Sequence, residues 1–264
     1  MSSFSTAGER ACIHGPGRLA GRFRRMKRRI APGGYIYHVL NRAIVDIRLF
    51  EGPDDYRAFE RLLADACARF GMRLLSYQLM PNHWHLVLWP REDGDLPKFM
   101  HWLCTTHARR WRLAHNSKGR GCVYQSRYKS FPVETGRYFI ALCRYVERNA
   151  LAAGLVKRAE DWRFGSLWRR MHPNITADVP PLCDWPGGRS DTWVEFVNEP
   201  RTKKELAAIS PSLTKGRPFG SPTWQQSTAK ELELESTLRR RGRPRKTERK
   251  PGVSSSEKEL RALN

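Results

Sequence analysis

Two histidines separated by a single residue are the first side chains in this chain whose spacing suggests chemistry. His83 and His85 belong to the run Met-Pro-Asn-His-Trp-His at residues 80–85, which leads into an apolar stretch rich in strand-forming residues. Successive side chains in a strand point to opposite faces, so the two imidazoles project from one side and Trp84 from the other. The pair could therefore hold one metal ion, although two histidines at this spacing also occur as a polar patch on a sheet.

A second group of candidate residues lies further along the chain. Apolar residues recur at intervals of three and four through residues 134–151, which predicts an amphipathic helix. Tyr145 and Asn149 are one helical turn apart, so both face the same way on that helix. A tyrosine at such a position is usually part of the core. Its combination with the histidine pair leads us to interpret Tyr145 as a nucleophile.

Together these motifs resemble a known family. A His-hydrophobe-His strand followed by a helix with one tyrosine and a polar residue four positions later is similar to the histidine-hydrophobe-histidine endonucleases with a single catalytic tyrosine. Within this group, residues 80–85 and 145–156 most resemble the REP-associated tyrosine transposases, and the resemblance covers about residues 27–170. The chain departs from the family at residues 149–154, where Asn-Ala-Leu-Ala-Ala-Gly replaces the usual Asn-Pro-Val-Arg-Ala-Gly.

The resemblance implies a specific reaction. Tyr145 would attack a DNA phosphodiester, displace the 3′ oxygen and retain a 5′ phosphotyrosine for a later joining step. His83, His85 and the amide oxygen of Asn149 would hold a divalent ion, and this mixture of nitrogen and oxygen donors suits Mg²⁺ or Mn²⁺ better than structural zinc. The implied substrate is single-stranded DNA beside short palindromic hairpins. Two alternatives stay open: a replication-initiator or relaxase-type nickase, and a non-catalytic DNA-binding regulator on the same fold.

Periodicity and turn residues predict the elements that position these side chains. The order is β-α-β-β-α-β-α, a ferredoxin-like split of the α+β class, with a four-stranded antiparallel sheet and helices on one face. A Pro-Asn turn at residues 81–82 joins the second and third strands. The expected strands cover residues 35–40, 73–79, 83–89 and 124–133, and the expected helices cover residues 54–70, 95–115 and 134–151.

The composition favours a nucleic-acid partner. The formal net charge is +22 and the isoelectric point is about 10.4, which is typical of proteins that bind polyanions. A ribosome-associated or merely basic protein is the less specific alternative. Basic side chains on the second helix, in the fourth strand and in the C-terminal tail are the candidate DNA contacts: Arg109, Arg110, Arg127, Lys129, Arg217, Arg241 and Arg243.

Regions outside the expected domain at residues 27–170 differ from it in composition. We expect residues 1–26 to be disordered, and we hypothesise that Met26 is the natural start. Prolines and glycines predict an irregular docking extension over residues 171–214. We interpret residues 215–264 as a basic DNA-binding tail. It is predicted to include a short helix with Ser221 as N-cap and Pro222 as its first residue. The Arg-Gly-Arg-Pro run at residues 241–244 resembles an AT-hook, a motif that inserts arginines into a narrow minor groove. The alternative is that this tail binds DNA only as a generic polycation.

Cysteine usage and hydropathy indicate the compartment. The six cysteines form no C-x-x-C pair and show no zinc spacing. No apolar run approaches the 18 residues of a membrane span, and no signal-peptide pattern is present. We therefore expect a soluble, cytoplasmic and nucleoid-associated protein with no membrane partner. A homodimer is an open alternative to a monomer, because the tyrosine helix of such an enzyme can serve its own subunit or a partner's.

Overall fold

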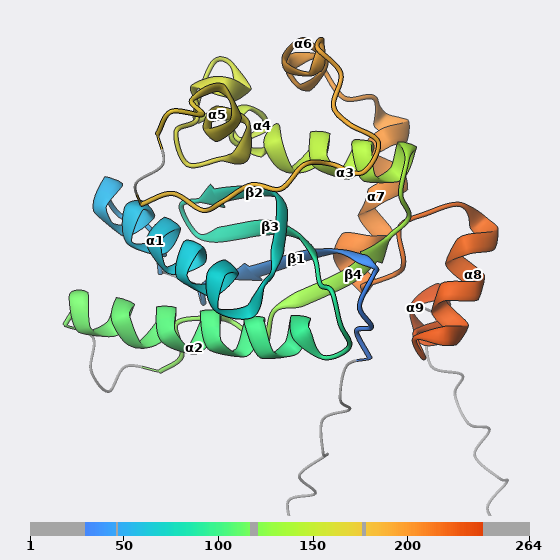
Figure 1. Ribbon diagram of the computed structural model, residues 1–264, viewed down its shortest axis with the longest axis horizontal. Helices are drawn as coiled ribbons and strands as arrows, with labels where there is room; N and C mark the ends of the chain where they lie inside the picture. Colours follow the sequence, from blue (N-terminus) through green and yellow to red (C-terminus); the bar gives the residue numbers. More distant parts are fainter. Residues whose placement is uncertain (1–29, 46, 117–120, 176–177, 240–264) are drawn as a thin grey trace, which may run out of the picture.

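Four antiparallel strands form the centre of the molecule. The computed structural model describes residues 30–45, 47–116, 121–175 and 178–239. Within them the strand order is β2-β3-β1-β4, and all neighbouring strands are antiparallel, which confirms the predicted α+β fold with its four-stranded sheet (Figure 1). The strands are β1 (Ile36–Arg42), β2 (Arg73–Met80), β3 (His83–Trp89) and β4 (Lys129–Val133).

Two long helices cover one face of the sheet. Both helices begin and end close to their predicted bounds. The first of them begins at Pro53 and ends before Gly71. The φ of Gly71 is 59°, a left-handed conformation that glycine adopts readily. Trp84 points to this face and is completely buried there, as the alternation along β3 predicts. The helices are α1 (Pro53–Phe70) and α2 (Asp95–Ala114).

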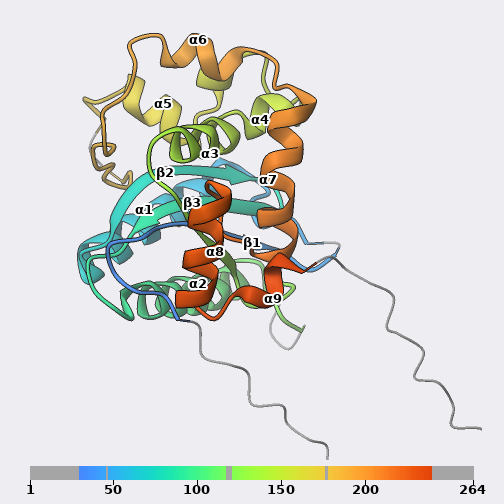
Figure 2. The same ribbon diagram turned by 90° about the vertical axis from the view of Figure 1, so that its right-hand side faces the viewer.

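The opposite face of the sheet is covered as well. The helix α3 (Arg137–Glu147) packs Phe139, Leu142 and Val146 against this face, so it lies across the sheet from α1 and α2 (Figures 1 and 2). The sequence-based expectation placed the helices on one face only. The difference has a simple cause, because β2 and β3 carry buried side chains on both faces and each apolar face of a sheet must be covered.

Two predicted elements are shorter than expected. The tyrosine helix ends at Glu147 and is followed by the separate turn α4 (Asn149–Ala152). The fourth strand begins only at residue 129. Before it, Tyr124 makes an isolated bridge to Ala43 and turns its hydroxyl inward, where Trp84 and His107 contact it. Tyr124 therefore packs against α2, while residues 125–127 are exposed and lie outside the ladder of β1 and β4.

The C-terminal third wraps around α3 and the edge of β4. Cys183 donates its backbone N–H to Leu74 at 2.9 Å, and Phe219 forms a parallel bridge with Val133. The segment expected to be irregular contains two helices, and the helix predicted after Ser221 begins at Pro222. No helix in the described ranges is long and apolar enough to cross a membrane. The elements are η1 (Ala159–Asp161), α5 (Ser166–Met171), α6 (Trp193–Asn198), α7 (Lys203–Lys215), α8 (Pro222–Glu231) and α9 (Glu235–Leu238).

Candidate active site

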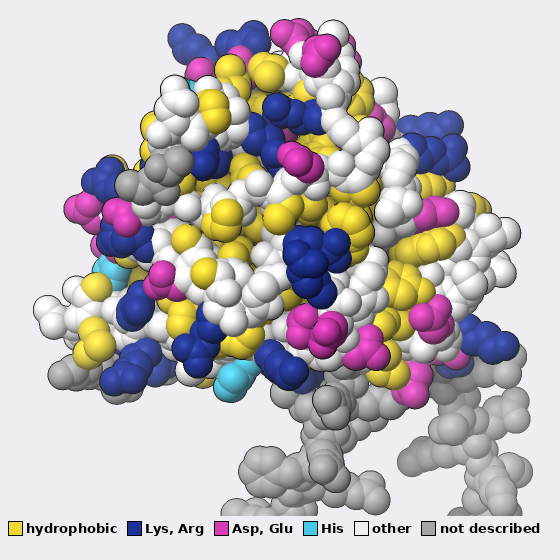
Figure 3. All heavy atoms as spheres, viewed as in Figure 1, with side chains coloured by type: hydrophobic (Ala, Val, Ile, Leu, Met, Phe, Trp, Pro, Cys, Tyr) yellow, Lys and Arg dark blue, Asp and Glu magenta, His cyan; other side chains and the backbone are white. Residues whose placement is uncertain are grey.

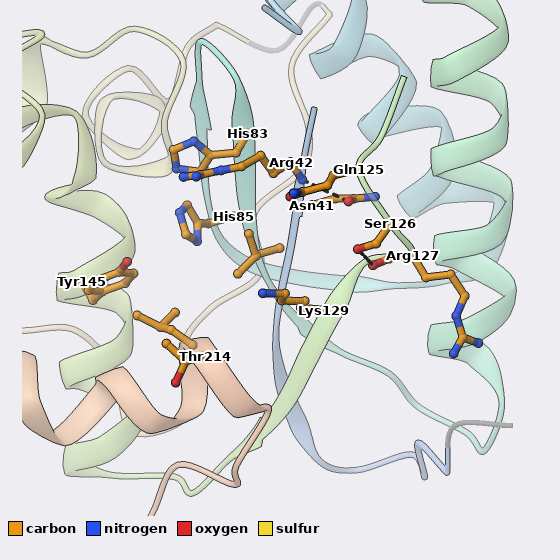
Figure 4. A pocket seen from close by; sticks show the side chains of 12 residues that line it. Asn41, Arg42, His83, His85, Gln125, Ser126, Arg127, Lys129, Tyr145 and Thr214 are labelled. Carbon is orange, nitrogen blue, oxygen red and sulfur yellow. Dashed lines mark hydrogen bonds between the residues drawn. The ribbon is translucent and has the colours of Figure 1, made fainter. Parts of the chain in front are cut away.

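The histidine pair, the tyrosine and the asparagine come together on the α3 side of the sheet. The ring centroids of His83 and His85 are 5.0 Å apart, and the His85 ring lies 5.8 Å from the Tyr145 ring. The Nε2 atom of His85 is 3.3 Å from the side-chain nitrogen of Asn149. Figure 4 shows His83, His85 and Tyr145 around one pocket. Residues far apart in the sequence are thus placed within reach of a single ion or phosphate.

Local structure explains this arrangement. Alternation along β3 points both imidazoles toward α3, and the antiparallel pairing with β1 sets Leu40 opposite His85 and Arg42 opposite His83. The break between α3 and α4 falls at Arg148, whose φ and ψ of −84° and −3° remain close to helical values. Tyr145 and Asn149 therefore stay on one face despite the break.

Hydrogen bonds orient both imidazoles in the same way. The Nδ1 atom of His83 lies 2.7 Å from the side-chain oxygen of Asn82, and the Nδ1 atom of His85 lies 2.9 Å from Nε2 of His38. The oxygen of Asn82 can only accept, so His83 carries its proton on Nδ1. With the same assignment for His85, both Nε2 atoms carry a lone pair, and that of His85 accepts a hydrogen bond from the Asn149 amide. A metal-binding histidine needs such a partner on its other nitrogen.

Burial keeps these imidazoles neutral. Burial, with a smaller contribution from Arg42, lowers the pKa of His83 to about 4, and burial also lowers the pKa of His85 well below its ordinary value. The pKa of His38 falls to about 3 for the same reason. Only neutral imidazole binds a metal, so both pair members are competent ligands at neutral pH.

The sequence did not single out His38. This side chain is fully buried, and its Nδ1 atom has no hydrogen-bond partner among the described residues. The imidazole lies on β1 behind His85 and holds it in place. The sequence signals only that a histidine lies in an expected strand. Its contact with His85 depends on the register between β1 and β3, which the sequence alone does not give.

The donor set fits a divalent ion. No cluster of three or more His, Cys, Asp or Glu side chains exists within the described ranges, so a third ligand must come from another type of group. Asn149 can supply it, because turning its amide over would place the oxygen, in place of the nitrogen, beside His85. Two imidazole nitrogens and one amide oxygen leave further positions for water or phosphate oxygens, as Mg²⁺ and Mn²⁺ require.

Opposing influences act on Tyr145. Burial raises the pKa of its phenol, whereas Arg201, the hydrogen bond with Asn149 and Arg42 lower it. The guanidinium carbon of Arg201 lies over the ring, 4.8 Å from its centroid. Arg201 belongs to the loop between α6 and α7, and nothing in the sequence signals that it contacts the tyrosine.

The pocket in front of these residues has a volume of about 340 Å³. Its walls come from β1, β3, the segment that leads into β4, and α7, as Figure 4 shows. Arg42 and Lys129 supply positive charge at its rim, and Thr214 closes the α7 side. The pocket is therefore suited to an extended anionic chain passing over the imidazoles.

The predicted DNA contacts are not gathered at one place. Lys129 and Arg127 both line the pocket, although the Arg127 side chain extends away from the histidines in Figure 4. Arg109 lines a separate, mostly apolar hollow beside α2, and Arg110 is exposed on the same helix. Arg217 is half-buried after α7. Arg241 and Arg243 lie outside the described residues, as does the predicted disordered segment at residues 1–26.

Charge on the surface is mixed. On the face drawn in Figure 3, lysine and arginine side chains are interspersed with acidic ones and form no continuous patch. Electrostatics on this face alone therefore does not define a binding surface, and the pocket remains the best-defined candidate.

The C-terminal extension fixes the helix that carries Tyr145. Arg144 is buried, donates to the carbonyl oxygen of Phe196 at 2.8 Å and forms an ion pair with Glu205 at 2.6 Å. The carboxylate of Glu147 accepts a hydrogen bond from the indole of Trp193 at 2.7 Å. The two residues that flank Tyr145 on the far side of α3 are thus anchored to α6 and α7.

A comparison with protein families agrees with the motif-based expectation. Residues 33–149 match the model of the IS200-like transposase family. A solved structure of a REP-associated tyrosine transposase bound to a REP hairpin is 16% identical, with a TM-score of 0.46 and coverage of 62% of this chain and 96% of that one.

A second solved structure, described as a transposase from Deinococcus radiodurans, is 17% identical, with a TM-score of 0.33 and coverage of 52% of this chain and 97% of that one. No curated protein matches the chain. The family match includes both histidines, Tyr145 and Asn149. Over residues 33–149, a little under half of its length, the chain is thus similar to the IS200-like transposase family.

Proposed function

We propose that this protein is a metal-dependent single-stranded DNA endonuclease and transposase. It would cleave and rejoin DNA at short palindromic hairpin repeats through a 5′-phosphotyrosine intermediate. One observation carries the proposal: Tyr145 and His85 line one open pocket, with Asn149 next to His85, inside the region that matches the transposase family. A structural tyrosine would be packed and bonded on all sides.

His83, His85 and Asn149 are the proposed holders of Mg²⁺ or Mn²⁺. A bound ion of this kind polarises the scissile phosphate and spreads the negative charge that develops there. The protein's own contribution is to keep both imidazoles neutral and to direct their Nε2 atoms toward the pocket. The bond between His85 and His38 also resists rotation of the ring when the pocket fills.

Tyr145 is the proposed nucleophile. Its hydroxyl oxygen forms a bond to phosphorus while the bond between phosphorus and the 3′ oxygen breaks; the phenol loses its proton to solvent and the 3′ oxygen gains one. An ordinary phenol is ionised in only about one molecule per thousand at neutral pH, and burial reduces that fraction further. The nearby cations and the Asn149 side chain offset this cost and hold the oxygen in line.

The substrate is proposed to enter as a flexible single strand. The backbone must bend so that one phosphate reaches the tyrosine, which a rigid duplex resists. Lys129 and Arg42 at the rim would contact neighbouring phosphates, and the arginines of α2 would contact the strand beyond. A DNA substrate of this kind implies a cytoplasmic, nucleoid-associated protein.

A cleavage assay tests the proposal. The full-length chain is incubated with end-labelled single-stranded oligonucleotides that carry a palindromic hairpin, with Mn²⁺ or with a chelator, and Tyr145→Phe serves as the inactive control. We expect metal-dependent cleavage and a covalent DNA adduct only in the wild type. Hairpin binding without cleavage under every metal condition would contradict the proposal and would favour a DNA-binding regulator.

A further inference from the structure

An arginine outside the region that matches the transposase family contacts the proposed nucleophile. Arg201 precedes α7 and lies beyond residues 33–149, yet its guanidinium carbon is 4.8 Å from the centroid of the Tyr145 ring. The side chain is about half-buried. Its Nη1 atom is shielded from solvent and has no hydrogen-bond partner among the described residues. Stacking on an aromatic ring leaves the N–H groups of a guanidinium free at its edge.

The acceptors around Arg201 are already used. Glu205, whose carboxylate acts on the pKa of Arg201, caps α7 through Thr202 and pairs with Arg144 at 2.6 Å. The carbonyl of Glu199 accepts from Arg144 and from Arg148, each at 3.0 Å. Both of these arginines add positive charge next to Arg201. Half-burying a cation next to other cations, with one of its donors unpaired, costs free energy. A bound anion would offset this cost.

We propose that Arg201 binds a non-bridging oxygen of the DNA phosphate that Tyr145 attacks. The inference rests on the proposed function and assigns part of that site to the C-terminal extension. Arg201 forms and breaks no covalent bond. Its planar guanidinium would hold the phosphate beside the tyrosine hydroxyl and offset the negative charge that accumulates on the phosphate oxygens.

The extension is built to hold this arginine in place. On one side of Arg201, Trp193 is buried and bonded to Glu147 of α3. On the other side, Thr202 and Glu205 form a reciprocal capping box at the start of α7. The loop that carries Arg201 is therefore fixed at both ends relative to the helix that carries Tyr145, which is the preorganisation that phosphate recognition requires.

The same helix offers a matched control. The guanidinium carbon of Arg137 also lies 4.8 Å from a tyrosine centroid, that of Tyr138, but Arg137 is exposed and donates to the Tyr138 hydroxyl. Arg137→Ala therefore removes one positive charge and one cation–π contact from α3 without touching the pocket. Any difference between Arg201→Ala and Arg137→Ala reflects position and not net charge.

The first experiment varies the charge of the phosphate. Cleavage rates are measured for the wild type, Arg201→Ala, Arg201→Lys and Arg137→Ala on a hairpin oligonucleotide with an ordinary phosphate or a neutral methylphosphonate at the cleavage position. On the phosphate we expect Arg201→Ala to lose about 100-fold, Arg201→Lys to lose less, and Arg137→Ala to match the wild type. On the methylphosphonate the Arg201 variants would approach the wild type, because little charge remains to be neutralised.

Two cleavage results would overturn the inference. If Arg201→Ala cleaves the phosphate substrate as Arg137→Ala does, Arg201 has no role in the reaction, and the proposed function still stands. If Arg201→Ala and Arg201→Lys lose activity equally on both substrates, the side chain only supports the fold. Circular dichroism and thermal unfolding identify any variant that is not folded.

A second experiment needs no cleavage. Calorimetry with inorganic phosphate, in a chelator at fixed ionic strength, compares the wild type with Arg201→Ala and Arg137→Ala. We expect about tenfold weaker binding for Arg201→Ala only, as loss of a charge-assisted contact predicts. Equal phosphate affinity in all three proteins would refute the inference. If the wild type does not cleave DNA, the proposed function fails, and this titration still decides whether Arg201 binds phosphate.

Discussion

Two histidine–tyrosine pairs lie on opposite faces of the sheet, and they differ in what surrounds them. On the α2 face, the hydroxyl of Tyr124 accepts a hydrogen bond from the indole of Trp84 at 3.1 Å and shares another with Nδ1 of His107 at 2.6 Å. On the α3 face, His85 and Tyr145 contact each other through their rings, and both line an open pocket. The first pair is bonded within the protein, and the second is open to a ligand.

The difference suggests which features would separate a structural pair from the pair that we propose to be reactive. Each pair combines the same two residue types, and burial lowers the histidine pKa in both. The α2-face pair has a complete hydrogen-bond chain of donor, hydroxyl and acceptor. The α3-face pair lines a pocket, and beside it the Nη1 atom of Arg201 has no hydrogen-bond partner among the described residues. Residue type alone therefore does not identify the site, whereas unused hydrogen-bonding capacity at a pocket does.

Removal of the open histidines is expected to have the largest effect. The double variant His83→Ala and His85→Ala would lose metal-dependent cleavage entirely, because the ion keeps at most one protein ligand. Calorimetric titration with Mn²⁺ checks the cause directly. His107→Ala is the matched control and would bind Mn²⁺ as the wild type does. Equal Mn²⁺ affinity in the double variant would show that His83 and His85 are structural.

Asn149→Ala tests the third ligand and is expected to have a smaller effect on cleavage. Water can replace a neutral oxygen ligand, so cleavage would weaken without disappearing. Higher Mn²⁺ concentrations would restore part of the rate, because the loss is one of ion affinity. Rates measured over a Mn²⁺ series check this. A loss that no Mn²⁺ concentration reduces would assign Asn149 to the orientation of Tyr145 instead.

The buried pair predicts a pH dependence of stability. Burial lowers the pKa of His107 from its ordinary value of 6.5 to about 3. The folded state thus resists protonation that the unfolded chain accepts, so the stabilisation is complete above pH 6.5 and is lost as the pH falls toward 3. At pH 5 the loss amounts to about 2 kcal/mol. Urea unfolding at pH 7 and pH 5 measures it, and His107→Gln would show a correspondingly weaker dependence.

Tyr124→Phe is expected to have the smallest effect. The substitution leaves Trp84 Nε1 and His107 Nδ1 without their partner, which costs about 1–3 kcal/mol of unfolding free energy. Cleavage would continue at the wild-type rate below the melting temperature. Thermal unfolding and a cleavage assay at low temperature check the two parts. A loss of cleavage in the folded variant would mean that the two pairs are not functionally distinct.

Local patterns predicted the sheet and its histidines well. Alternation placed His83 and His85 on one side of β3 and Trp84 on the other, and turn residues at positions 81–82 defined the hairpin. Helical spacing put Tyr145 and Asn149 on one face. These features depend on neighbours close in sequence, which is why a single sequence determines them.

Contacts between distant segments could not be predicted in the same way. The bond between His38 and His85 depends on strand register, and the contact between Arg201 and Tyr145 depends on how the extension folds back over α3. The late start of the fourth strand, at residue 129, accompanies the inward turn of Tyr124, which the apolar pattern does not reveal. The residues that complete the site are thus the ones whose neighbours lie far away in the chain.

Mapping the covalent attachment site tests the central claim most directly. The full-length protein is incubated with Mn²⁺ and a hairpin oligonucleotide, the adduct is digested with protease and nuclease, and mass spectrometry locates the nucleotide. The proposed chemistry predicts a phosphotyrosyl nucleotide on the peptide that contains Tyr145 and on no other peptide. Attachment at Tyr124 or at any other residue would contradict the assignment of Tyr145 as the nucleophile.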